Sequence, residues 1–378
     1  MPAPPPPLVP DFSFLTVTPE MMEQDPLALR QGLASLGDRH LLTLKVPEEW
    51  GGKGLTTAEY FQFQMALTRQ SGTLAFTQTQ HQSAASFIVE GNNPELKSKY
   101  LAGMATGQYR MGIGFSHLRR SGEPSLRATP SDRGYCLNGV IPWLTGWGLF
   151  QDAVIAATLP EGGSVWGIIP LVETPHCKPS PPMALAAMPA TQTVAIALEN
   201  YELQPEQILN THPLHWLQHQ DQQGLLKATA FCLGSAQSSL DLVQAAATHH
   251  PELQPAAAAL QHQWQRCYQH IQIALSPEAP EASSLADRLK LRGSAIALAG
   301  RCAQAAVAVS RGAANHLSHR SQRIYREMLV FTVSGQSLPI LQATLEGIVQ
   351  MGAEGNGYQR SGSKTPSFQD GFMLDVLI

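Results

Sequence analysis

The segment from Gly112 to about Leu209 constrains the fold of this chain most, because its pattern differs from that of both flanks. Short apolar runs alternate there with glycine and proline, as in YCLNGVIPWLTG, DAVIAATLP, SVWGIIPLV and TVAIALENYEL. This spacing predicts a small antiparallel β domain. Helical periodicity precedes the segment from about Pro19 to Met111 and resumes after His215.

The two flanking segments are patterned as long helices. TTAEYFQFQMALTRQ and NPELKSKYLAGMATGQ predict helices before the β domain, and the second is expected to end near Gly107. Four helical runs after the β domain, three of them alanine-rich, predict a four-helix bundle with closely approaching helices. We expect an α+β fold that is mostly α. The expected parts are a proline-rich tail (1–18), an N-terminal helical domain (19–111), a central antiparallel β domain (112–210), a C-terminal four-helix bundle (211–350) and a tail (351–378).

Composition narrows the class of protein. Hydrophobic residues make up 43% of the 378 residues and charged residues 14%, which is typical of a globular chain. The net charge of -4 and the absence of a basic patch argue against nucleic-acid binding. The chain has no run of 18 apolar residues, so no membrane span is predicted. The segment PAPPPPLVPDF lacks the features of a signal peptide, and we therefore expect a cytoplasmic protein. The five cysteines form no C-x-x-C pair, which argues against a metal site or a disulfide framework.

The stretch NGVIPWLTGW (138–147) places Trp143, Thr145 and Trp147 close together in a predicted strand. Phe115 and Ser116 lie upstream, in GFSHLRRSG. Indoles in such a strand are ordinarily core residues of the β domain, and this segment alone favours that interpretation. Flat aromatic walls with a few fixed donors would equally suit a planar ligand.

Five fragments in order resemble the acyl-CoA dehydrogenase superfamily over roughly residues 20 to 345. VPEEWGGKGL (46–55) is similar to that family's early Pro-Glu-Glu-x-Gly-Gly-x-Gly-Leu loop, and LNGVIPWLT is similar to its L-N-G-x-K-x-W-I-T strand. The other three fragments are NPELKSKYLAGMATGQ, MPATQTVAIALENYELQPEQIL and RGAANHLSHRSQRIYRE.

The resemblance implies a flavoprotein oxidoreductase that binds FAD through its β domain. Trp143 would pack by the flavin ring system, Thr145 would donate near N5, and Phe115 and Ser116 would meet the pyrimidine end. Trp147 is expected in the core or at an interface. Gly312 would lie near the FAD of a neighbouring subunit in a homodimer or homotetramer. Two arginines and a glutamate of the last helix hairpin, Arg323, Arg326 and Glu327, are expected to form structural ion pairs.

Conventional members of the family use a glutamate as general base, and this chain departs from that pattern. The usual Glu-Gly-Thr step falls on Gly335-Gln336-Ser337, or begins at Ser334 after a one-residue shift. The second known place falls at Gly224, and the nearest acid, Asp221, lies almost one turn away. We therefore leave the base unassigned.

The Arg-x-x-Phe-Gly motif, which reaches the FAD pyrophosphate across a subunit interface, falls on HPELQ (250–254). That sequence has no arginine to pair a diphosphate, so FMN is an alternative to FAD.

Three functions stay open. The first is a flavin-dependent oxidoreductase acting on the CH-CH bond of an acyl thioester or a similar small molecule. The second is a flavin-dependent monooxygenase of the same fold, with His81 as the candidate catalytic residue and His117 as a further one, because histidine suits proton transfer near neutral pH. The third is a non-catalytic member that serves assembly or ligand binding. Arg119 and Arg120 are interpreted as exposed loop arginines.

Overall fold

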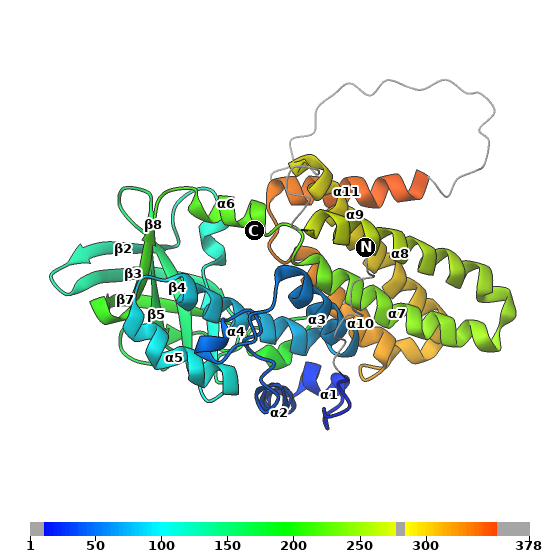
Figure 1. The fold of residues 1–378 in the computed structure, drawn as a ribbon, viewed down its shortest axis with the longest axis horizontal. Coiled ribbons are helices and arrows are strands. Elements are labelled where there is room, and N and C mark those ends of the chain that lie inside the picture. Colours follow the sequence, from blue (N-terminus) through cyan, green and yellow to red (C-terminus); the bar gives the residue numbers. More distant parts are fainter. Residues whose placement is uncertain (1–10, 277–283, 354–378) are drawn as a thin grey trace, which may run out of the picture.

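A computed structural model describes residues 11–276 and 284–353, which form three parts side by side (Figure 1). Helices come first along the chain, a sheet follows, and a bundle of long helices ends the described residues. The expected fold class, α+β and mostly α with this order of parts, is confirmed, whereas the expected antiparallel character of the sheet is only partly correct. The outer parts of the two predicted tails, 1–10 and 354–378, lie outside the described residues.

The N-terminal helices begin where the sequence provides capping side chains. Thr18 Oγ1 accepts a hydrogen bond from the backbone amide of Met21 at 3.2 Å. Thr56 and Glu59 form a capping box, in which each side chain accepts a hydrogen bond from the other residue's backbone amide. The last of these helices ends before Gly107, whose φ of 79° is left-handed, as predicted. These helices are α1 (Pro19–Gln24), α2 (Pro26–Gly37), α3 (Thr57–Gln70), α4 (Gly72–Glu90) and α5 (Pro94–Thr106).

The central sheet has the order β6-β7-β3-β2-β4-β5-β8, with β1 paired to β4. It is mixed and not antiparallel throughout, because β1 and β2 both run parallel to β4. Parallel neighbours need a long crossover, and β2 and β3 lie in the chain between β1 and β4. The strands are β1 (Met111–Gly114), β2 (Leu126–Ser131), β3 (Gly134–Leu144), β4 (Asp152–Thr158), β5 (Ser164–Pro170), β6 (Cys177–Pro179), β7 (Val194–Leu203) and β8 (Ile208–His212).

A glycine shapes the strand that carries the NGVIPWLTGW motif. Gly139 has a φ of 130°, and a Cβ there would lie 2.2 Å from the carbonyl oxygen of Ser125. The register of β3 on β7 shifts between Leu137 and Gly139 and again between Ile141 and Leu144. These irregularities bend β3 as it approaches Trp143.

The C-terminal helices pack closely through small residues, as the alanine-rich pattern predicts. A Cβ on Gly234 of α7 would lie 2.3 Å from the carbonyl oxygen of Met65 in α3. On α9, a Cβ on Gly293 would lie 2.1 Å from the carbonyl oxygen of Ala343 in α11. The helices are α6 (Trp216–Gln223), α7 (Thr229–His249), α8 (Gln254–Leu275), α9 (Leu285–Ser310), α10 (Arg320–Val333) and α11 (Leu338–Ala353).

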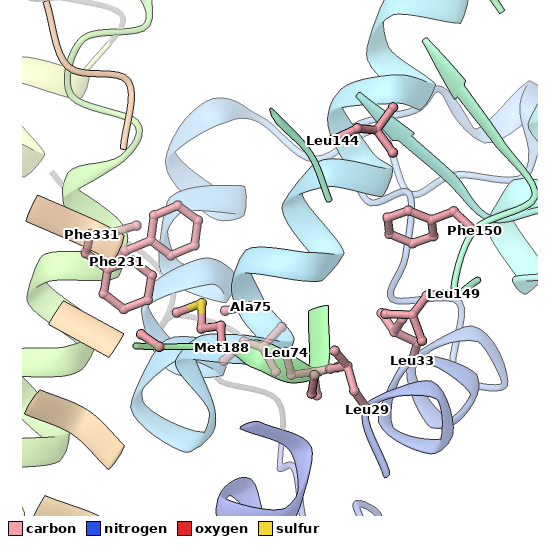
Figure 2. Packing of buried hydrophobic residues seen from close by; sticks show 14 of the residues in the cluster. Leu29, Leu33, Leu74, Ala75, Leu144, Leu149, Phe150, Met188, Phe231 and Phe331 are labelled. Atoms are coloured by element: carbon pink, nitrogen blue, oxygen red, sulfur yellow. The ribbon is translucent and has the colours of Figure 1, made fainter. Parts of the chain in front are cut away.

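One apolar core runs from the sheet through α4 to the bundle (Figure 2). Leu33 of α2 and Phe150, which follows β3, lie on one side of it, and on the other side Phe231 of α7 stacks on Phe331 of α10 with ring centroids 5.0 Å apart. Phe12, which precedes α1, is buried and belongs to this core as well. The sheet and the helices are therefore held in a fixed relation, which a site between them requires.

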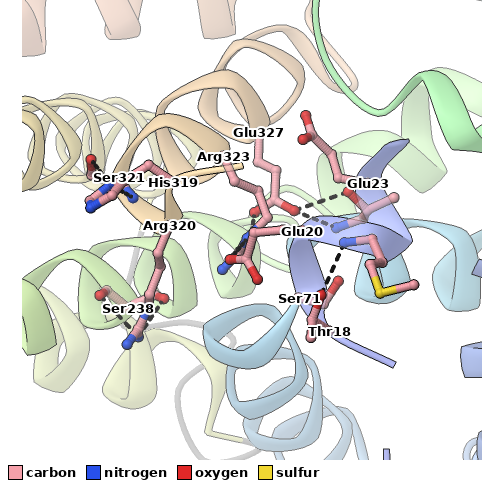
Figure 3. A network of polar contacts seen from close by, with 12 residues as sticks. Thr18, Glu20, Glu23, Ser71, Ser238, His319, Arg320, Ser321, Arg323 and Glu327 are labelled. Atoms are coloured by element: carbon pink, nitrogen blue, oxygen red, sulfur yellow. Dashed lines mark hydrogen bonds and ion pairs between the residues drawn. The ribbon is translucent and has the colours of Figure 1, made fainter. Parts of the chain in front are cut away.

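A buried ion network joins α1 to α10 (Figure 3). Arg323 pairs with Glu20 at 3.0 Å and with Glu327 at 2.8 Å, and Arg326 pairs with Glu23. The amide of Thr73, at the start of α4, donates to Glu327 at 2.9 Å. The expectation that Arg323, Arg326 and Glu327 form structural ion pairs is confirmed.

Among the helices of the described residues, none has the length and apolar content needed to cross a membrane. Within the same residues, no three histidine, cysteine, aspartate or glutamate side chains come together as a metal site.

Candidate functional site

A cavity of about 680 Å³ opens where the sheet meets α4, α7 and α10. We call it the main cavity. Four of the five residues predicted to contact a cofactor line it. Its lining residues are Phe76, Gln80, Ile113, Phe115, Ser116, Arg119, Arg120, Trp143, Thr145, Leu185, Ala186, Ala187, Met188, Thr191, Thr193, Phe231, Leu329, Val330, Val333, Ser334, Gly335 and Gln336.

Local structure explains why these four residues converge. Phe115 directly follows β1, which ends at Gly114, and Ser116 begins a short 3-10 helix, η2 (Ser116–Arg119). Trp143 and Thr145 lie at the end of β3, and the Trp143 indole is 43% exposed on the cavity side of the chain. Trp147, in contrast, packs against the core, as the sequence analysis expected. The stretch NGVIPWLTGW therefore contributes one exposed indole and one hydroxyl to the main cavity.

Three threonine hydroxyls form a chain along one wall of the cavity. Thr193 Oγ1 lies 3.2 Å from Thr145 Oγ1 and 3.2 Å from Thr191 Oγ1. Thr191 donates to the carbonyl oxygen of Met188 at 2.7 Å, so its hydroxyl accepts from Thr193 in this chain. Thr193 uses its one proton on Thr191, so Thr145 donates to Thr193 and its oxygen can only accept at the cavity wall, which corrects the expectation that Thr145 would donate near N5.

Thr191 and Thr193 are functional candidates that the sequence did not single out. Thr191 ends η3 (Pro189–Thr191) and Thr193 directly precedes β7, nearly fifty residues after Thr145. The pairing of Leu144 with Val194 and the bond from the Gly146 amide to the Thr191 carbonyl at 2.8 Å bring the segments together. Only the repeated threonine in ATQT gives a local signal, and it does not reveal the partner strand.

The charge lining the main cavity is positive. Arg119 lies over the Phe115 ring at 5.3 Å and forms a bidentate pair with Asp221 of α6, at 2.7 and 2.8 Å. Arg120 is exposed and has no ion pair with any described residue. No lining residue of this cavity is an aspartate or glutamate. Arg119 is thus partly buried at the site and is not simply an exposed loop arginine.

A second space, which we call the side groove, has a volume of about 370 Å³ and adjoins the main cavity. It lies between α3 and α4 on one side and α6 and the start of α7 on the other. The two spaces share six lining residues, Ile113, Phe115, Arg119, Phe231, Ser334 and Gly335. A ligand in the groove would therefore reach the main cavity directly.

Both positions at which the resemblance places a general base line the side groove. Gly224 occupies one, and Ser334 with Gly335 occupies the other. Asp221 also lines the groove, but its carboxylate is engaged by Arg119. Glu90 is the other carboxylate among the lining residues. The geometry agrees with the sequence in providing no carboxylate at either base position.

His81 lies outside the lining of both spaces. Its Nδ1 accepts the Met111 amide at 3.1 Å, which leaves Nε2–H to donate to the Met104 carbonyl at 3.0 Å. Burial lowers the pKa of His81 to about 4, so the ring is neutral near pH 7. The ring joins α5 to β1, and its proposed catalytic role stays a prediction without support from this geometry.

His117 is also buried and neutral, although it follows Ser116. Its Nε2 lies 3.0 Å from the Ala156 carbonyl, which makes Nε2–H the donor, and Nδ1 has no partner among the described residues. Burial lowers its pKa to about 4. The side chain does not line either space.

Gly312 does not join the other four predicted contacts. It lies in η6 (Arg311–Asn315), after α9, and is not among the residues that line the main cavity. The preceding Arg311 lines a separate cleft at the end of the bundle with His249 and His250. The HPELQ segment thus lacks an arginine of its own, but Arg311 lies beside it.

Comparisons with known proteins agree with this architecture. The sequence profile "Acyl-CoA dehydrogenase, N-terminal domain" matches residues 16–108. Isovaleryl-CoA dehydrogenase of Solanum tuberosum is 28% identical over 126 residues, which cover 32% of this chain and 31% of that protein. An acyl-CoA dehydrogenase of Bacillus subtilis is 26% identical over 163 residues, which cover 41% and 43%. The matches thus span less than half the length of these relatives.

Solved structures show the same fold over most of the chain. Butyryl-CoA dehydrogenase from Megasphaera elsdenii has a TM-score of 0.73 at 17% identity and covers 89% of this chain and 94% of its own. The acyl-CoA dehydrogenase from Geobacillus kaustophilus has a TM-score of 0.73 at 15% identity, with coverage of 85% and 90%. The chain is thus similar to acyl-CoA dehydrogenases over residues 16–108 in sequence profile and over most of its length in fold.

Proposed function

We propose that this chain is a flavin-dependent oxidoreductase that holds the ring system of a flavin in the main cavity. The observation that carries the proposal is the convergence of Trp143, Thr145, Phe115 and Ser116 on one open cavity of about 680 Å³. Typical pockets for small molecules have volumes of about 300–1,000 Å³, apolar walls and a few placed polar groups.

The residues present fit a flavin ring. The exposed Trp143 indole offers a flat surface for an extended π system. Thr145, which donates to Thr193, supplies a fixed acceptor oxygen for an N–H group of the ring. Arg119 and Arg120 favour negative charge in the cavity, where no lining carboxylate opposes it. A bound flavin would supply two-electron transfer, and these residues would orient it and tune its charge.

We propose FAD rather than FMN, on the basis of the cleft at the end of the bundle. Arg311, His249 and His250 line that cleft, and a guanidinium suits a diphosphate. The cleft is separate from the main cavity of the same chain. In an oligomer, the cleft of one copy would therefore have to lie against the flavin bound in the main cavity of another copy. Exchange of Arg311→Gln should lower FAD retention and leave FMN binding unchanged. Equal loss of both flavins would contradict this assignment.

The proposed oligomer is a homodimer or a homotetramer. An apolar stripe on α10, formed by Tyr325, Leu329 and Val333, is 46–64% exposed. α11 adds Leu341 and Leu345, at 44% and 55%. Exposed apolar surface of this kind marks an interaction site, and Leu329 and Val333 also line the main cavity. A second copy on this face would therefore also close the cavity.

The proposed substrate is an acyl thioester, such as an acyl-CoA, bound in the side groove beside the flavin. A monooxygenase is the second candidate, because neither Gly224 nor Ser334–Gly335 provides the base that removal of an α-proton requires. Anaerobic reduction of bound flavin by acyl-CoA would favour the dehydrogenase. Incorporation of oxygen into an added substrate during flavin reoxidation would favour the monooxygenase.

The direct test is flavin retention. Purified protein should show the visible absorbance of a flavin, or quench the fluorescence of added FAD. Trp143→Ala with Thr145→Ala should lower flavin occupancy strongly and leave helical content unchanged by circular dichroism. Trp147→Ala is the matched control, since that indole packs on the core and does not line the cavity. Unchanged occupancy in the double variant would remove the proposal.

A further inference from the structure

The three threonine hydroxyls on the wall of the main cavity form a chain with one hydrogen-bond direction. The Met188 carbonyl can only accept, so the Thr191 hydroxyl donates to it at 2.7 Å. Thr193 therefore donates to Thr191, and Thr145 donates to Thr193, each at 3.2 Å. All three protons are used within this chain of hydroxyls. The Thr145 oxygen consequently offers the main cavity a lone pair and no proton.

The two backbone amides that follow Thr145 are also used within the fold. The amide of Gly146 donates to the Thr191 carbonyl at 2.8 Å, and the amide of Trp147 donates to the Gln192 carbonyl at 3.2 Å. Neither amide is therefore available as a donor beside the Thr145 oxygen. A flavin ring that reaches Thr145 meets an acceptor that these amides do not flank with donors.

The N–H groups of a flavin ring differ between its two redox states. The oxidised ring has one N–H, at N3, and this group lies between two carbonyl oxygens that need donors of their own. Reduction by two electrons adds an N–H at N5, where the oxidised ring has only an acceptor. An isolated acceptor such as the Thr145 oxygen suits this new N–H, whereas it forms no hydrogen bond with N5 of the oxidised ring.

The charge of the main cavity favours the same redox state. Two electrons and one proton, which the substrate supplies in the proposed reaction, convert the neutral oxidised ring into an anion that is unprotonated at N1. Arg120 lines the cavity, is exposed, and has no ion pair with any described residue. No lining residue of the cavity is an aspartate or glutamate. A nearby cation without an opposing carboxylate stabilises the anionic ring.

We propose that the Thr145 oxygen accepts the N–H that the flavin gains at N5, so that the main cavity binds reduced flavin more tightly than oxidised flavin. The inference rests on the proposed function, because it assumes that a flavin ring occupies this cavity. Tighter binding of the reduced form raises the midpoint potential of the bound flavin above that of free flavin, which favours electron transfer from the substrate. Thr191 and Thr193 are positioning residues, because they act through the Thr145 hydroxyl.

The test compares the affinities of the two redox states. Purified protein is titrated with oxidised FAD and, without oxygen, with FAD reduced by dithionite, and the midpoint potential of bound FAD is measured by equilibration with a redox dye. Thr145→Val, which removes the acceptor, should weaken binding of reduced FAD about three- to tenfold relative to binding of oxidised FAD. For a two-electron couple, this change lowers the midpoint potential by about 15–30 mV. Thr145→Ser should keep the wild-type potential.

Thr191→Val tests the direction of the hydrogen bonds without a change at Thr145. Thr193 then loses its acceptor and can donate to Thr145, whose proton becomes free to point into the cavity. The Met188 carbonyl still accepts a hydrogen bond from the Thr191 amide at 3.0 Å, so that oxygen keeps a donor. This variant should lower the midpoint potential at least as much as Thr145→Val does.

Thr77→Val is the matched control, because the Thr77 hydroxyl donates to the Thr73 carbonyl at 2.8 Å and lines neither the main cavity nor the side groove. It should keep the wild-type potential. Bound flavin whose potential is the same in wild type and Thr145→Val would overturn the inference and leave the flavin proposal standing. An unchanged or higher potential in Thr191→Val would overturn the assigned hydrogen-bond direction. Wild-type protein that binds FAD in neither redox state would reject the proposed function, and the inference with it.

Discussion

Replacement of His117 by glutamine should make the protein less sensitive to acid. Protonation of buried His117 would place a second N–H at Nδ1, where no acceptor lies among the described residues. Glutamine keeps an N–H for the Ala156 carbonyl, cannot be protonated in this pH range, and loses no partner at Nδ1. The variant therefore separates the titration of this side chain from its structural bond.

The size of the change in the free energy of unfolding follows from the pKa of His117. The folded state lowers the pKa of His117 from 6.5 to about 4, mainly through burial. Because the folded-state pKa is depressed, the unfolded chain binds more protons between these values, and stability falls as pH drops through that window. Each unit corresponds to about 1.4 kcal/mol, so the free energy of unfolding falls by about 2 kcal/mol between pH 7 and pH 5 and by about 3 kcal/mol once titration is complete.

The assay is urea unfolding at pH 7 and pH 5 for wild type and His117→Gln. The two proteins should differ little at pH 7, and the variant should be more stable than wild type by about 2 kcal/mol at pH 5. His262→Gln, at an exposed position on α8, serves as the control. An equal loss of stability in wild type and His117→Gln on acidification would refute this account of His117.

Three further substitutions test other parts of the structure. Arg323→Met should destabilise the fold by about 3–5 kcal/mol in chemical denaturation, because it leaves Glu327 buried without its cation; a loss below about 1 kcal/mol would contradict this. Gly234→Ala should cost about 1–3 kcal/mol, since its Cβ would meet the Met65 carbonyl at 2.3 Å and push α7 from α3; an unchanged unfolding midpoint would show that the helices separate freely. Thr193→Val should weaken flavin binding measured by fluorescence quenching, with unchanged circular dichroism; full affinity would show that Thr145 needs no support.

Local sequence pattern predicts those parts of the fold that depend on local interactions. The helical periodicity, the capping residue Thr56 and the terminating Gly107 act within a few residues, and each is found where the sequence places it. Parallel pairing of β1 and β2 with β4 was not predicted, because it depends on a crossover that no local pattern encodes.

For the site, too, residues that adjoin in sequence could be predicted, and residues joined by long-range pairing could not. Trp143 and Thr145 adjoin each other in one recognisable motif, so their place at the cavity could be predicted. Thr191 and Thr193 reach Thr145 through long-range pairing of β3 with β7, which a single sequence does not display. For His81, the sequence shows a histidine at a suggestive position. Only coordinates show that backbone groups already occupy both ring nitrogens.

The two positions without a base are linked by one buried cation. Arg292 of α9 is 4% exposed and donates to the Leu225 carbonyl at 2.9 Å and to the Ser334 carbonyl at 2.6 Å. Leu225 directly follows Gly224, so one guanidinium holds both segments against the side groove. The two segments are therefore tied together, and neither position carries a carboxylate.

Ser334→Glu should consequently restore α-proton removal if the chain keeps the rest of a dehydrogenase site. Ser334 has an ordinary φ of -63°, whereas Gly335 has a φ of 62° that disfavours any side chain. A positioned general base contributes about 10²–10⁴-fold, so anaerobic reduction of bound flavin by acyl-CoA should accelerate by at least about 100-fold. Ser334→Gln is the control of equal shape. If Ser334→Glu retains flavin and binds thioester but reduces flavin no faster than Ser334→Gln, the groove does not present the α-carbon to this position, and the monooxygenase becomes the better proposal.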